Sequence, residues 1–355
     1  MDQLWWNHII KAHTFLEDIV KETVGGNSML LSLPVSVPWR NTLIDLVGEQ
    51  LEMENSKNKF EEIECPDEEP GAFLMKKYCK KEICAKYRYG MSYAQFLGKC
   101  QETVLNDRYI WVSNITKEKI TQWIDFVSEY NKNVQEKAPG IFILEVHDDS
   151  MARKSKKGIK TILFNQNIGA YAFCALASSE TNCKEFLRPY LAEIVSSICR
   201  DDVELCAECV SRGTDFLNAP YETIQEIVKE LYRSDGEAYE FERTKEEVIV
   251  SIWETQLKYV FPLTENYRRY FVNHYNAEIK AVLPINNGYG GKVTLPEEVE
   301  LGTLFYMAGR GDITISSRES AELERYRDAR NKLAHMNILD NEELYMLLKT
   351  GKRKM

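Results

Sequence analysis

A short run near the end of the sequence, RNKLAH at residues 330–335, combines side chains that handle anions and protons. Its His335 belongs to the residue type whose unperturbed pKa lies near neutrality, so it can take up or release a proton at physiological pH. Its Arg330 offers a charged fork of N–H donors. On an ideal helix the two side chains stand about 140° apart. Both therefore reach one cleft only if the helix ends near His335, or if each serves a composite site.

This run resembles the R-N-x-x-x-H signature of the HEPN superfamily, a group of helical-bundle proteins that includes many RNases. The resemblance covers about residues 246–349. It implies metal-independent RNA cleavage in which the 2′-hydroxyl attacks the adjacent phosphorus, with His335 as general acid or base. Arg330 would clamp the phosphate and Asn331 would orient the pair. The family normally forms its cleft from two copies, so this role needs a dimer.

A structural role for the same run is the alternative. Arg330 would then pair with a buried acid or a carbonyl oxygen, and His335 would cap the C-terminal end of the helix, where a cation is favourable.

A second candidate site stands at residues 34–42, PVSVPWRNT, between a predicted strand and a predicted helix. The spacing matches a phosphate-binding loop, G-x-x-x-x-G-K-[ST]. The chemistry is altered, because Pro34 and Trp39 replace the glycines, Arg40 replaces the lysine, and Asn41 replaces the hydroxyl that binds Mg²⁺. Prolines also remove backbone N–H donors from the loop.

Another predicted buried strand leads into Glu145, 105 residues after Arg40, at the place where a P-loop protein carries its metal-binding acid. Together the two segments resemble the AAA+/STAND class of P-loop ATPases with the nucleotide chemistry lost. The resemblance covers about residues 25–235 and assigns nucleotide-binding positions to Arg40, Asn41, Thr42 and Glu145. It implies no cofactor and no metal, and at most vestigial nucleotide binding without hydrolysis. An unrelated α/β domain with a proline-rich turn is the alternative.

Predicted helices and strands alternate in the first part of the chain, and they must position these residues. Apolar periodicity predicts helices at 5–23, 42–51, 94–104 and 117–131. Short apolar runs predict buried strands at 29–33, 108–112, 140–146 and 161–164. Such alternation predicts an α/β domain with a mostly parallel sheet. The charged stretch 52–90 interrupts the pattern, and we expect an irregular surface excursion there.

From about Asn167 onward the pattern predicts helices and no strands, with a long helix at 246–281 that Pro262 kinks or breaks. The expected fold class is therefore α/β followed by all-α. We expect a degenerate P-loop-like domain with a parallel sheet at residues 1–175 and a helical lid or linker at 176–240. A HEPN-like helical bundle is expected at 241–355.

The charge balance limits the partners. The 355 residues carry 45 Lys and Arg against 55 Asp and Glu, a net charge of −10, which argues against a general nucleic-acid coat or an anionic-membrane binder. Two local basic clusters stand out, at 76–88 with interleaved tyrosines and at 153–160. Charge with aromatic residues suits a nucleic-acid strand, and a solvated loop is the simpler interpretation.

The sequence shows no apolar stretch near the ~20 residues of a membrane span and no signal-peptide pattern at its start. Its nine cysteines are scattered. We expect a cytoplasmic protein with free thiols and no membrane partner.

These observations predict a non-catalytic regulatory or assembly subunit of a bacterial anti-phage defence or toxin-like system, working with other protein subunits as a homo- or hetero-oligomer. The setting is an analogy with the places where such domain pairs usually occur. The alternative is a HEPN endoribonuclease that acts on RNA as a dimer, with the N-terminal domain as sensor or inhibitor. An ATP-dependent motor is the third and weakest interpretation.

Overall fold

The computed structural model describes residues 1–34, 36–88, 90–100, 105–134, 139–147, 149–152, 156–164, 169–286 and 291–351. The chain divides into two compact units. One comprises Met1–Gly169 with Arg233–Glu237, and the other comprises Ala170–Tyr232 with Ala238–Met355. The sequence predicts three parts with boundaries at 175 and 240, whereas the helices of the expected lid and of the expected bundle belong here to one compact unit.

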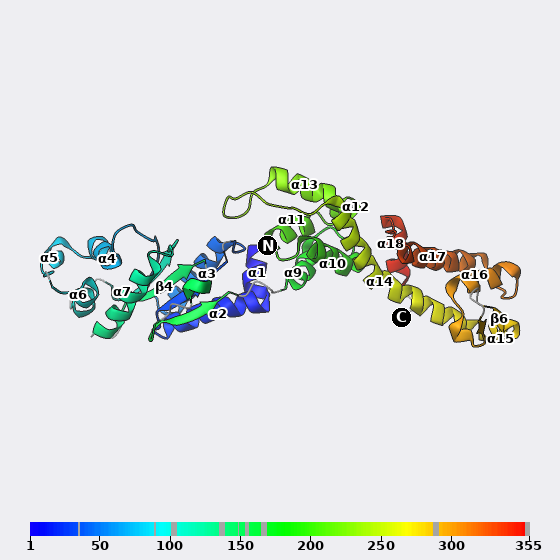
Figure 1. Ribbon diagram of the computed structural model, residues 1–355, viewed down its shortest axis with the longest axis horizontal. Helices are drawn as coiled ribbons and strands as arrows, with labels where there is room; N and C mark the ends of the chain where they lie inside the picture. Colours follow the sequence, from blue (N-terminus) through cyan, green and yellow to red (C-terminus); the bar gives the residue numbers. More distant parts are fainter. Residues whose placement is uncertain are drawn as a thin grey trace. The chain divides into compact units, whose positions relative to one another are not determined.

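A parallel sheet forms the centre of the first unit (Figure 1). It has five strands in the order β2-β3-β4-β1-β5. Its strands are β1 (Met29–Ser32), β2 (Lys59–Glu64), β3 (Arg108–Ser113), β4 (Ile141–Val146) and β5 (Lys160–Leu163). β1, β3 and β4 are buried along nearly their whole length, as expected for the inner strands of a parallel sheet covered on both faces. The predicted α/β class with a parallel sheet is confirmed for this unit.

Helices cover both faces of the sheet. Because side chains alternate along a strand, Phe142, Leu144 and Val146 of β4 share one face. They join a core cluster with α4 (Pro70–Tyr78), α5 (Lys81–Cys84), α6 (Tyr93–Lys99) and α7 (Ile120–Asn133). Ile141, Ile143 and Glu145 point to the opposite face. The helices on that side of the sheet are α1 (Asp2–His8), α2 (Ile10–Val24) and α3 (Arg40–Glu54). A short helix, α8 (Asp149–Ala152), follows β4.

The expectation of an irregular excursion at 52–90 is wrong for much of that stretch. It contains the edge strand β2 and the helices α4 and α5. β2 shows no apolar run because only Ile63 of its six residues is buried. An edge strand pairs on one side only, so its sequence can stay charged.

The second unit consists mainly of helices. Its first group of helices is α9 (Ala170–Ala177), α10 (Arg188–Cys199), α11 (Val203–Ser211), α12 (Thr214–Asn218) and α13 (Pro220–Glu230). The long α14 (Lys245–His274) is followed by α15 (Asn276–Val282), α16 (Leu301–Arg310), α17 (Ser317–Ala334) and α18 (Asn341–Gly351). Short 3₁₀ helices occur at Ser178–Glu180, Glu185–Leu187 and Pro296–Glu298. Because α14 packs against α10 and also against α17 and α18, it links the two groups of helices.

Two expectations for this unit need correction. The helix is not broken at Pro262, because α14 runs through it and ends at His274. The proline removes one helical hydrogen bond, but Val260 and Thr264 beside it are fully buried and hold the helix in place. Strands also do not vanish, because β6 (Ile285–Asn286) and β7 (Lys292–Val293) form a short antiparallel pair. This pair lies in a stretch rich in glycine and asparagine, which shows no apolar alternation.

The last hundred residues pack as a helical cluster. Tyr267 of α14 stacks on Tyr326 of α17 with ring centroids 4.0 Å apart and nearly parallel planes, which fixes the two helices against each other. Membership of the HEPN superfamily stays a prediction. Across the described ranges, no helix is both long and apolar enough to cross a bilayer.

Candidate functional site

The turn from β1 into α3 holds the first candidate site. β1 and β4 end side by side, since Ser32 pairs with Val146, and ligands of parallel α/β sheets bind outside this carboxyl edge. Trp39, just before the first residue of α3, has a φ of 46°, in the left-handed region that favours glycine. The residue that replaces a loop glycine therefore lies at the strand-to-helix turn with a glycine-like backbone. Val35 of the same turn lies outside the described residues.

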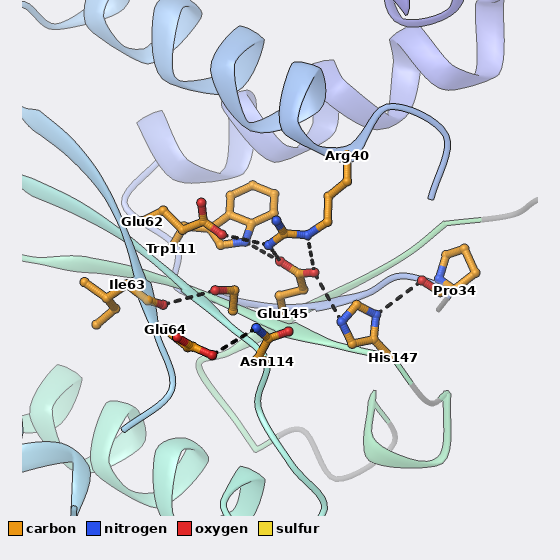
Figure 2. A network of polar contacts seen from close by, with 10 residues as sticks. Pro34, Arg40, Glu62, Ile63, Glu64, Trp111, Asn114, Glu145 and His147 are labelled. Carbon is orange, nitrogen blue, oxygen red and sulfur yellow. Dashed lines mark hydrogen bonds and ion pairs between the residues drawn. The ribbon is translucent and has the colours of Figure 1, made fainter. Parts of the chain in front are cut away.

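Arg40 and Glu145 form a bidentate ion pair at this edge (Figure 2). Arg40 Nε donates to Glu145 Oε1 at 2.8 Å, and Arg40 Nη2 donates to Oε2 at 2.5 Å. The Glu145 side chain is 0% exposed and the Arg40 side chain 24%. Burial opposes the charge on Arg40, but hydrogen bonding and attraction to Glu145, and then to Glu62, raise the pKa of the guanidinium above its usual range. The positive charge of Arg40 is therefore stabilised by the carboxylates of Glu145 and Glu62.

Three further side chains complete this network. Trp111 Nε1 donates to Glu145 Oε2 at 2.6 Å, and Glu62 Oε1 accepts from Arg40 Nη2 at 2.8 Å. His147 Nε2 lies 3.4 Å from Glu145 Oε1, and its Nδ1 lies 3.2 Å from a backbone carbonyl oxygen of the turn. Each Glu145 oxygen thus has two polar neighbours, which is the condition for burying a carboxylate at an acceptable free energy.

The structure brings together two of the four predicted nucleotide-binding residues, Arg40 and Glu145. Asn41 is exposed at the start of α3. The Thr42 hydroxyl donates to Asp2 Oδ2 at 2.9 Å, so it ties α3 to α1. A phosphate at this turn would therefore have to take Arg40 from Glu145.

Trp111 and Glu62 are not among the predicted site residues. A buried indole N–H usually has a hydrogen-bond acceptor. The sequence places a tryptophan on one predicted buried strand and a glutamate on another, and that pair of residues could have predicted the bond from Trp111. Glu62 belongs to β2, whose charged sequence does not predict a strand. For metal binding, the described ranges contain no group of three or more His, Cys, Asp or Glu side chains that could hold an ion.

The second candidate site lies at the C-terminal end of α17. The helix ends at Ala334, and His335 follows as its C-cap, with its backbone N–H donating to Asn331 O at 3.1 Å. The condition that the helix ends near His335 is therefore met. Arg330 Nη2 donates to Glu300 Oε2 at 3.1 Å, and the Glu300 side chain is 68% exposed. The structural alternative expects a buried acid or a carbonyl oxygen as the partner of Arg330 and a cap at His335; the acid found here is open to water, and His335 is the C-cap.

The other two members of the motif face solvent. Asn331 and His335 are exposed, and Arg330 Nη1 lies 3.5 Å from Asn331 Oδ1. Within the part of the chain that the structure describes, the imidazole of His335 has no hydrogen-bond partner. The buried side of the same turn is fixed, because Trp253 Nε1 of α14 donates to Leu333 O at 2.8 Å. The helix end thus presents a cation, an amide and a titratable ring from a rigid support.

Comparison with known proteins adds little to this geometry. No protein-family model and no curated protein matches the chain. Among solved structures, a point mutant of RuvB from Thermotoga maritima is similar with a TM-score of 0.34 and 11% identity, over 70% of this chain and 74% of that one. A likeness of this size assigns neither a fold family nor a function.

Proposed function

We propose that the first unit is a P-loop-like scaffold that no longer handles a nucleotide, and that the chain acts as a regulatory or assembly subunit. The observation that carries this proposal is the bidentate pair between Arg40 and the fully buried Glu145. In a working phosphate-binding loop the cation at this position reaches the phosphates. Here it is engaged by Glu145 and by Glu62.

The energetics of that pair support the proposal. Taking Arg40 away leaves a buried carboxylate without its counter-ion, which costs about 3–5 kcal/mol. A penalty of this size lowers affinity by roughly 10²- to 10⁴-fold. Trp39 also places a large side chain where a loop glycine lets the backbone approach phosphate. Binding energy from a nucleotide would have to exceed both costs before any affinity remained.

An assembly role needs surface for other proteins, and α9 offers one. Tyr171 and Leu176 are each 44% exposed, and Ala172 and Ala175 of the same helix are exposed as well. Apolar surface of this kind is typical of protein contacts. The partners we propose are subunits of the bacterial defence or toxin-like system that the resemblance implies, in a homo- or hetero-oligomer.

Calorimetric titration with Mg-ATP and Mg-ADP, together with a phosphate-release assay, tests the scaffold. We expect neither saturable heat nor hydrolysis from the wild-type chain. Glu145→Gln weakens the hold on Arg40, and nucleotide binding that appears in this variant only would identify the pair as the block. Glu64→Gln, at the exposed end of β2, is the matched control. Micromolar binding by the wild-type chain contradicts the proposal.

An endoribonuclease is the second candidate, and the exposure of the α17 motif favours it. An exposed ion pair contributes about 0–1 kcal/mol, so Arg330 can leave Glu300 for a phosphate at little cost. Incubation with RNA in EDTA tests this role. Cleavage that disappears in His335→Ala but persists in His274→Ala, a change at another exposed histidine of the same unit, supports it. A dimer confirmed by light scattering that leaves RNA intact excludes it.

A further inference from the structure

A small, strongly basic surface lies on the first unit and shares no residue with either site described above. We call it the basic knob and define it as residues 80–88, which comprise α5 and the turn after it (Figure 1 shows α5 at one end of this unit, next to α4 and α6). The knob carries four cations and one acid, all exposed, in a chain whose net charge is −10. These are Lys80, Lys81, Glu82, Lys86 and Arg88.

The knob is compact and firmly anchored. Ile83 at its centre is 4% exposed and belongs to the core cluster under the sheet. Ile83 N donates to Lys80 O at 2.9 Å, and Lys86 N donates to Ile83 O at 2.9 Å, so the backbone coils around this anchor. Nine residues coiled in this way span roughly 15 Å. That length exceeds the Debye length of about 10 Å at 0.1 M salt, so only cations that lie close together in the coil reinforce one another.

The lysines of the neighbouring helix α4 are paired with acids, whereas three of the four cations of the knob are not. Lys76 pairs with Glu68 at 3.0 Å and Lys77 pairs with Glu61 at 2.6 Å. By contrast, the side chains of Lys80, Lys81 and Arg88 make no ion pair or hydrogen bond with any described residue. Three of the four cations of the knob are therefore not paired with an acid of the described residues.

The other basic cluster of the sequence, at 153–160, is less available. Lys156 pairs with Asp125, and Lys160 lies 3.7 Å from Glu22. Arg153 and Lys154 lie outside the described residues. The knob is thus the cluster with the clearer charge complementarity to an anionic polymer.

We propose that the basic knob binds a single-stranded nucleic acid through its phosphates. Charge complementarity selects a polyanion. The short span of the cations favours a flexible strand, which can bend to bring successive phosphates to them, whereas a duplex has a persistence length of about 150 base pairs. Tyr87 is used internally, stacked on Tyr93 at 4.5 Å and donating to Met91 O. Phosphate contacts without base contacts make the binding independent of sequence.

Fluorescence anisotropy with a labelled oligothymidylate of about 20 nucleotides tests the full chain. This probe lacks the 2′-hydroxyl, so RNA cleavage cannot interfere, and an oligouridylate is measured beside it. Four phosphate contacts predict a slope of log K against log salt of about −3 and an affinity loss of about 50-fold between 50 and 200 mM salt. This slope is measured on the wild-type chain and does not depend on any variant.

The knob variant changes Lys80, Lys81, Lys86 and Arg88 to Gln. We expect its affinity at about 50 mM salt to fall at least about tenfold and its salt slope to approach zero. The control variant changes Lys11, Lys57, Lys132 and Lys229 to Gln, which alters the net charge by the same amount at exposed positions elsewhere. All of these side chains are exposed, so both variants should keep the wild-type unfolding midpoint.

Loss of binding in the knob variant alone, for both single-stranded probes, supports the proposal. Equal losses in the two variants overturn it, because they indicate a general charge effect. Absence of wild-type binding at 50 mM salt also overturns it, as does tighter binding of a duplex of the same length. If polyglutamate competes as well as the oligonucleotide, the surface serves an acidic protein and the assignment to nucleic acid is wrong.

Discussion

Arg40 and Arg330 both donate to a glutamate, but the two glutamates differ in their contact with water. Glu145 is 0% exposed and is also bonded by Trp111, whereas Glu300 is 68% exposed. The damaged loop motif therefore has its cation locked into the fold, and the intact helix motif has a cation that a ligand can recruit. Retention of a charged residue in a motif and availability of its charge are separate properties.

Replacing each arginine should give the largest difference in stability between the two ion pairs. Arg40→Ala leaves Glu145 buried without its counter-ion, and we expect the first unit to lose about 3–5 kcal/mol of unfolding free energy. Arg330→Ala removes an exposed pair, so the second unit should lose at most about 1 kcal/mol. Hydrogen exchange measured by mass spectrometry reports the two units separately.

Arg40→Lys is the matched control for this experiment. It keeps the positive charge but loses the bidentate geometry, so the unfolding free energy of the first unit should lie between those of the wild type and Arg40→Ala. Equal losses for Arg40→Ala and Arg330→Ala would show that burial does not separate the two pairs.

The N-terminal end of α17 offers a third case, in which hydrogen bonds stabilise the negative charge of Glu319. Glu319 Oε2 accepts from Ser316 Oγ at 2.6 Å, and Oε1 accepts from Tyr275 Oη at 2.7 Å. Hydrogen bonds from the Ser316 side chain, the Tyr275 hydroxyl and the Ser316 backbone lower the pKa of Glu319 to about 2. A depressed carboxyl pKa contributes stability that is present above about pH 4.5 and is lost as the pH falls toward 2.

Glu319→Gln keeps the capping shape and removes the charge. Because the carboxylate is partly hydrated, we expect a loss of about 1 kcal/mol at pH 7. The difference from the wild type should shrink as the pH falls from about 4.5 to about 2. Hydrogen exchange of α17 peptides at several pH values measures it. A difference that stays constant over this range would mean that the loss does not come from the charge.

Glu62 offers a smaller test within the buried network. Its side chain is 36% exposed and it bonds only the outer side of Arg40. Glu62→Gln should therefore cost about 0.5 kcal/mol, well below the effect of Arg40→Ala. Glu64→Gln on the same strand, where the contact with Asn114 is 3.4 Å, is the control. A loss above about 2 kcal/mol would place Glu62 in the buried part of the network.

The two regions also differ in how far the sequence could predict them. Continuous apolar runs predicted β1, β3 and β4, because both faces of these strands are buried. β2 was not predictable from its pattern, since one buried residue in six gives no periodicity. A local motif pointed to Arg40, but the bond to Glu145 joins residues 105 positions apart. Such a pairing depends on strand order, which no local pattern contains.

The C-terminal motif shows the opposite limit. Its spacing predicted that α17 must end near His335 for the side chains to share a cleft, and the helix does end there. The partner of Arg330 was predicted only by type, as an acid or a carbonyl. Whether that acid is buried depends on the packing of α16 against α17, which the sequence of one helix does not specify.

The smallest predicted difference between the two ion pairs is the response of their coupling energies to salt. A double-mutant cycle on Arg330 and Glu300 should give a coupling of about 0.3–0.5 kcal/mol at low salt. It should approach zero in 1 M NaCl, where the Debye length is about 3 Å. The same cycle on Arg40 and Glu145 should keep its coupling, since salt does not enter the buried side of that pair. If the Arg330–Glu300 coupling exceeds about 1 kcal/mol and resists salt, Arg330 is held as firmly as Arg40. A phosphate could then not recruit it cheaply, and the endoribonuclease candidate would lose the observation that favours it.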